Sequence, residues 1–71
     1  MAIIDVIRKT DKKITANSHT VMDYNYNDEF FSMWSYKSGD LYGDYGTKQS
    51  LQFNKEIALE LKNALEKFCN Q

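Results

Sequence analysis

The clearest pattern along the chain is an alternation of apolar and polar residues in two neighbouring segments. In residues 20–26, Met22, Tyr24 and Tyr26 point one way from an extended chain and the residues between them point the other way. Residues 30–37 alternate again, and Asn27-Asp28 between the two segments is typical of a tight turn. A period of two residues indicates a strand with one buried face. The sequence therefore predicts a β-hairpin.

The second strand of this hairpin divides its side chains between two faces. One face holds Phe31, Met33, Ser35 and Lys37. The other holds Phe30, Ser32, Trp34 and Tyr36. One of the two must pack against the rest of the protein, which leaves the other free to meet water or a ligand.

Three further segments have strand character. Ala2–Ile7 is dense in Ile and Val, which favours a strand, although a helical turn fits nearly as well. Ile14–Asn17 is predicted as a short strand. Residues 49–53 alternate, with Leu51 and Phe53 inward and the polar residues outward. Between these strands, residues 41–46 read as a flexible glycine loop that carries two tyrosines.

A helix is predicted at the end of the chain. Asn54 is a favourable N-cap, and Glu56 in the first turn suits the positive end of the helix dipole. The helix then runs from Lys55 to about Cys69, with one apolar stripe formed by Ile57, Leu61, Ala64, Leu65 and Phe68. We expect Leu61, Leu65 and Phe68 to be buried against Phe53 and either Phe31 or Met33.

These elements predict a single α+β domain over residues 1–71. It consists of a small antiparallel sheet of three to five strands, within residues 2–53, packed against one C-terminal amphipathic helix. The 71 residues are 42% hydrophobic and 14% aromatic, enough for a small core. The chain has one cysteine, which excludes a disulfide scaffold, and no apolar run is long enough to span a membrane. We expect a cytoplasmic location.

Charge is balanced overall but unevenly placed. The net charge is −1, which is unusual for an autonomous nucleic-acid-binding domain. Residues 1–13 carry four basic and two acidic side chains, residues 14–46 one basic and five acidic, and residues 47–71 four basic and three acidic. The centre of the chain is therefore acidic and both ends are mildly basic.

Catalysis, metal binding and a cofactor are not expected. His19 is the only histidine, no Cys-x-x-Cys or His-Glu-x-x-His motif occurs, and no serine near His19 lies in a nucleophile motif. Asp40 and Asp44 flank the glycine loop and supply too few oxygens for calcium. We expect both to be solvated turn residues, and we expect no enzyme activity.

The aromatic residues are the strongest functional signal. Six of them crowd a 22-residue window: Tyr24, Tyr26, Trp34, Tyr36, Tyr42 and Tyr45. A row of exposed aromatic rings stacks nucleobases or fills a protein interface. The same rings can equally form the core of a small β-rich domain. For Trp34 and Tyr36 both interpretations remain open, whereas Tyr42 and Tyr45 lie on the glycine loop and are expected to be exposed.

Residues 20–68 resemble the PC4-like transcriptional coactivator domains. The resemblance lies in Phe31-Ser-Met-Trp-Ser-Tyr36, the tyrosine loop, and Lys48-Gln-Ser-Leu-Gln-Phe-Asn-Lys-Glu56 leading into Leu61 and Leu65. It implies a four-stranded antiparallel sheet with one helix per subunit, a dimer, and single-stranded DNA bound on the sheet. Trp34 and Gln49-Ser50 stand where the family has a basic residue and Lys-Gly.

The resemblance implies a module that binds single-stranded DNA or RNA, as an accessory factor of transcription or replication. Trp34, Tyr36, Tyr42 and Tyr45 would stack on bases, and Lys37 and Lys48 would contact phosphates; Lys12 and Lys13 are the other remaining basic positions.

The alternative is a protein-interaction module, a small regulator or inhibitor of a larger partner such as phages and mobile elements carry. Its basis is the near-neutral charge and the tyrosine loop. Leu59 lies off the apolar stripe of the helix, so it is either a solvated leucine or a contact in a homodimer.

Overall fold

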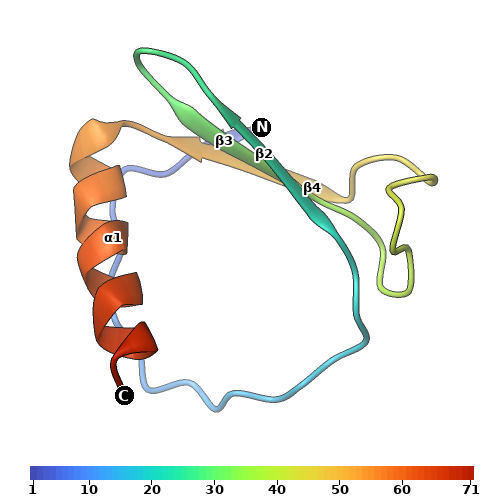
Figure 1. The fold of residues 1–71 in the computed structure, drawn as a ribbon, viewed down its shortest axis with the longest axis horizontal. Helices are drawn as coiled ribbons and strands as arrows, with labels where there is room; N and C mark the ends of the chain where they lie inside the picture. Colours follow the sequence, from blue (N-terminus) through green and yellow to red (C-terminus); the bar gives the residue numbers. More distant parts are fainter.

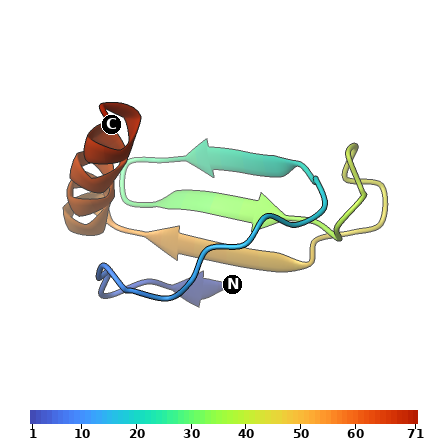
Figure 2. The ribbon, with the colours of Figure 1, turned by 90° about the horizontal axis from the view of Figure 1, so that it is seen from below.

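Four strands and one helix build the protein (Figure 1), and the computed structural model describes all residues, Met1–Gln71. The elements are β1 (Ala2–Ile3), β2 (Met22–Tyr26), β3 (Phe31–Ser35), β4 (Gln49–Phe53) and α1 (Lys55–Cys69). They form one sheet in the order β1-β4-β3-β2, shown in Figure 2. The α+β class, the strand number and the C-terminal helix are confirmed.

The predicted hairpin is β2 and β3. Tyr24 lies opposite Met33 and Tyr26 lies opposite Phe31 in an antiparallel register. Asn27 makes the turn, because its side-chain oxygen accepts hydrogen bonds from the amides of Glu29 and Phe30, both at 2.8 Å. The Asn27 amide donates to the Phe30 carbonyl at 3.0 Å and closes the hairpin.

The registers sort the side chains of the sheet onto two faces. What we call the apolar face carries Tyr24, Tyr26, Phe31, Met33, Leu51 and Phe53. What we call the polar face carries Asp23, Asn25, Ser32, Trp34, Ser50 and Gln52. The predicted alternation of β2, β3 and β4 is thereby confirmed.

The core lies at one corner of the sheet. The Phe31 ring stacks on Tyr24 and Phe53 at 5.4 Å between ring centroids, and on Tyr26 at 6.1 Å. Only two apolar side chains are buried: Phe53, 5% exposed, and Ile57 in the first turn of α1, 6% exposed. A row of stacked rings across three strands therefore ends against the start of the helix.

The helix begins and ends as its sequence predicts. Asn54 caps it, since its side-chain oxygen accepts the amide of Ile57 at 3.1 Å. Glu56 lies in the first turn and Lys67 in the last, where each suits the helix dipole.

The predicted burial of the helix stripe is wrong beyond the first turn. Leu61 is half-buried, while Leu65 and Phe68 are 51% and 68% exposed. Figure 1 shows why, because α1 leaves the end of β4 and runs away from the sheet. The spacing of apolar residues identifies one side of a helix, but the angle at which the helix leaves Asn54 decides what that side touches.

The N-terminal segment also differs from expectation. Regular strand structure covers only Ala2–Ile3 of the predicted Ala2–Ile7, with the Ile4 amide still donating to the Gln52 carbonyl at 2.8 Å. This strand pairs with β4 in parallel, so the sheet is mixed rather than wholly antiparallel. Ile14–Asn17 forms no strand; Ile14 is 94% exposed, because no strand edge lies beside it to pair with.

The two-residue core makes a testable prediction. Replacing Ile57 with Ala removes half of the buried apolar side chains, so it should lower the free energy of unfolding by about 2–5 kcal/mol. Leu59→Ala is the control on the same helix, since Leu59 is 61% exposed, and its effect should stay within about 0.5 kcal/mol. Urea unfolding followed by Trp34 fluorescence measures both variants. If Ile57→Ala and Leu59→Ala lowered the free energy of unfolding equally, the core would have to lie elsewhere.

Candidate nucleic-acid interface

Three of the six predicted nucleic-acid-binding residues belong to the polar face. Trp34 lies on β3 and is half-buried. Tyr36 follows β3 on the same side, where its hydroxyl donates to a carboxylate oxygen of Asp23. Lys48 directly precedes β4, and its amide donates to the Ser35 carbonyl at 2.8 Å, so the pairing of β3 with β4 includes it. Because side chains alternate along a strand, Lys48 lies with Ser50 on the polar face.

The hydrogen bond between Tyr36 and Asp23 has an electrostatic consequence. The Asp23 carboxylate accepts a hydrogen bond from the Tyr36 hydroxyl and thereby stabilises its protonated form. Desolvation and the negative charge of Asp23 act in the same direction, so the pKa of Tyr36 is raised above its ordinary value. The same hydrogen bond links the side chain of Tyr36, which follows β3, to Asp23 of β2.

The Tyr36 ring also supports the loop that follows β3. An added Cβ at Gly43 would lie 3.3 Å from Cζ of Tyr36, and Gly43 has a φ of +72°. Only glycine adopts this conformation without strain and without pushing the ring. The close approach joins the glycine loop to the polar face.

The glycine loop carries two further predicted residues into solvent. Tyr42 and Tyr45 are 85% and 80% exposed, which confirms the expected exposure of the loop tyrosines. The last of the six, Lys37, is exposed in the turn after β3. The structure thus places Trp34, Tyr36 and Lys48 on the polar face, and the contact of Gly43 with the Tyr36 ring joins the loop of Tyr42 and Tyr45 to that face.

Asp40 is not the solvated turn residue that its sequence context predicts. It is only 4% exposed, and its carboxylate oxygens accept the amides of Tyr42, Asp44 and Tyr45 at 3.1–3.2 Å. The sequence did contain a signal, because an aspartate followed by glycine-rich chain often accepts backbone amides in turns. Asp44, in contrast, is exposed as expected.

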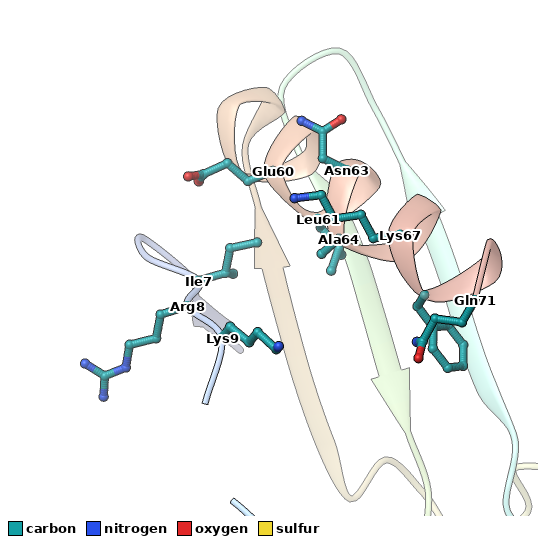
Figure 3. Close-up of a pocket in the computed structure, with 10 residues that line it drawn as sticks. Ile7, Arg8, Lys9, Glu60, Leu61, Asn63, Ala64, Lys67 and Gln71 are labelled. Atoms are coloured by element: carbon teal, nitrogen blue, oxygen red, sulfur yellow. The ribbon is translucent and has the colours of Figure 1, made fainter. Parts of the chain in front are cut away.

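A second feature, which the sequence did not reveal, lies between α1 and the N-terminal segment. A groove of about 870 Å³ has Ile7, Arg8 and Lys9 on one side and residues of α1 on the other (Figure 3). Its α1 side includes Leu61, Ala64, Lys67 and Phe68. The lining of the groove therefore combines four apolar residues with three basic residues and one acidic residue, Glu60.

The remaining candidates for chemistry stay apart. No three His, Cys, Asp or Glu side chains lie close enough together to hold a metal ion. His19 is exposed and contributes its backbone carbonyl to the loop, where it accepts the Gly39 amide at 2.7 Å. Cys69 is an exposed free thiol at the end of α1. No helix is both long and apolar enough to cross a membrane.

Comparison of the chain with protein-family models, with curated proteins and with solved structures found no match.

Proposed function

We propose that the protein is a small module that binds single-stranded nucleic acid on the polar face and tyrosine loop, as an accessory factor of transcription or replication in the cytoplasm. The observation that carries the proposal is that Trp34 and Tyr36 lie on that face, and that the loop packed on the Tyr36 ring exposes Tyr42 and Tyr45. The PC4-like order of segments supports the same proposal.

The chemistry of the polar face suits an unpaired strand. Unpaired bases expose both π-faces, and exposed aromatic rings stack on them with little regard to sequence. The hydroxyl and amide groups of Ser32, Ser50 and Gln52 offer hydrogen bonds to sugars and base edges. A duplex hides its base faces, so the arrangement favours single strands.

The charge of the chain limits how strongly phosphates contribute. With a net charge of −1 and only Lys37 and Lys48 near the aromatic cluster, few counterions are released on binding. Each phosphate contact on a single strand contributes a slope of roughly −0.7 to the dependence of log affinity on log salt. We therefore expect a shallow salt dependence and a large share of affinity from stacking.

Titration with oligo-dT at low salt, followed by the fluorescence of the single tryptophan, Trp34, tests the proposal. Binding should quench Trp34 with a dissociation constant in the micromolar range. The double variant Tyr42→Ser, Tyr45→Ser should bind at least about 5- to 150-fold more weakly, since each stacked base contributes about 1–3 kcal/mol.

The matched control is Tyr42→Phe, Tyr45→Phe, which keeps both rings and should bind like the original protein. Absence of quenching and of a salt-dependent isotherm at tens of micromolar would refute the proposal.

The alternative function, regulation of a larger protein partner, is favoured by the same two exposed tyrosines, because tyrosine is enriched at protein interfaces. A stoichiometric protein partner that survives nuclease treatment, together with no oligo-dT binding, would support that alternative.

We further propose that the module works as a homodimer. The chain exposes 6645 Å², whereas a compact monomer of its mass, 8.3 kDa, exposes about 4,600 Å². Removing the excess of about 2,000 Å² from each of two chains would bury about 4,000 Å² in total, which lies in the range of obligate homodimer interfaces.

Two apolar surfaces of the chain are unpartnered. One is the apolar face, where Tyr24 and Tyr26 are 62% and 69% exposed; the other is the stripe of α1 with Leu65 and Phe68. A second copy supplies each surface with its complement, in an isologous contact. The basic residues around the α1 groove also complement the acidic centre of the chain.

The dimer proposal is tested by two matched variants. Phe68→Glu places a charge in the α1 groove, twice in the assembly, and should convert dimer to monomer in sedimentation at tens of micromolar. Leu59→Glu adds the same charge at an equally exposed leucine on the opposite side of α1 and should leave the dimer intact. Dissociation by Leu59→Glu alone would place the interface at Leu59 instead. A protein that stays monomeric at hundreds of micromolar would contradict the dimer.

A further inference from the structure

A buried carboxylate lies within the loop that presents Tyr42 and Tyr45. One oxygen of Asp40 accepts the amides of Tyr42 at 3.2 Å and Asp44 at 3.1 Å, and the other accepts the amide of Tyr45 at 3.2 Å. Asp40 is the only charged or polar residue of the protein that is buried. Both tyrosines are thus attached through their own backbone amides to one side chain.

The charge of Asp40 is compatible with its burial because the loop surrounds it with donors. Desolvation alone would raise the pKa of this carboxyl, but hydrogen bonds from the amides of Asp44, Tyr45, Tyr42 and Gly43 outweigh it and hold the pKa below its ordinary value. Asp40 is therefore ionised at neutral pH. A carboxylate is an acceptor at both oxygens, so it can satisfy donors on both sides at once.

Asp40 is itself anchored to the rest of the protein. Its amide donates to the Lys37 carbonyl at 2.9 Å, and its carbonyl oxygen lies 2.9 Å from the Thr20 hydroxyl. The neighbouring Gly39 amide donates to the His19 carbonyl at 2.7 Å. Together with the contact of Gly43 on the Tyr36 ring, these bonds join the loop to the segment before β2 and to the polar face.

We propose that Asp40 is the positioning residue of the tyrosine loop, holding Tyr42 and Tyr45 as a preformed stacking pair for a single strand. This inference rests on the proposed function for its ligand, but the loop geometry stands independently of it. A loop that is already ordered loses less conformational entropy on binding, so its preorganisation appears directly as affinity. Asp40 touches no ligand and acts only through the two tyrosines.

Three variants separate positioning from general stability. Asp40→Ala removes both acceptors. Asp40→Asn keeps one acceptor oxygen for the amides of Tyr42 and Asp44 but replaces the oxygen that accepts from Tyr45 with a donor. Asp44→Ala is the control, because it removes the same charge from an exposed position of the same loop. Amide hydrogen exchange of residues 42, 44 and 45 and oligo-dT affinity are measured for each, with the amides of β3 and β4 reporting whether the sheet remains folded.

We expect Asp40→Ala to abolish protection of the three amides, to leave the sheet amides protected, and to weaken oligo-dT binding as much as Tyr42→Ser, Tyr45→Ser does. Added to that double variant, Asp40→Ala should weaken binding no further, because both changes remove the same contribution. Asp40→Asn should recover part of the protection and of the affinity. Asp44→Ala should match the original protein in both measurements.

Retained amide protection in Asp40→Ala would overturn the inference, as would lost protection with unchanged affinity, or a further loss of affinity in the combined variant. If the original protein binds no oligo-dT, the proposed function fails, and hydrogen exchange alone then decides whether Asp40 holds the loop. In that case lost protection in Asp40→Ala with the sheet intact supports the positioning role, and retained protection refutes it.

Discussion

The stacking of Phe31 on Phe53 is the contact on which the rest of the structure depends. It joins β3 to β4 directly before the first turn of α1, where Ile57 is the other buried apolar side chain. Because the core occupies one corner, the remainder of the apolar face and most of α1 have nothing of their own chain to pack against. The opposite, polar face contributes no buried apolar side chain. We propose that a second copy covers the apolar surfaces and that a ligand binds the polar face.

Local signals in the sequence predicted the elements well. Alternation located β2, β3 and β4, the Asn27 turn closed the hairpin, and Asn54 set the start of α1. Each of these depends on neighbouring residues alone. The path of α1, the parallel pairing of β1 and the irregular course of residues 14–17 depend on contacts between distant parts of the chain, which periodicity does not encode.

The candidate site was predictable in its residues but not in its construction. Alternation alone assigned Trp34 to the face opposite Phe31, and glycine content indicated that Tyr42 and Tyr45 lie on an exposed loop. The order within that loop was not foreseen, because it arises from amides of three residues converging on Asp40. A surface aspartate and a buried one look alike in a sequence, and only the path of the backbone around the carboxylate distinguishes them.

The central claim, that the polar face with its tyrosine loop is the ligand surface, is tested most directly by mapping amide and indole chemical shifts of the ¹⁵N-labelled protein during titration with oligo-dT. We expect the signals of the Trp34 indole and of the amides of Tyr42, Tyr45 and Lys48 to shift together in one saturable transition, while the amide signals of Ile57 and Ala64 on α1 stay unchanged. Shifts confined to the α1 groove and the apolar face, with the Trp34 indole unchanged, would contradict it.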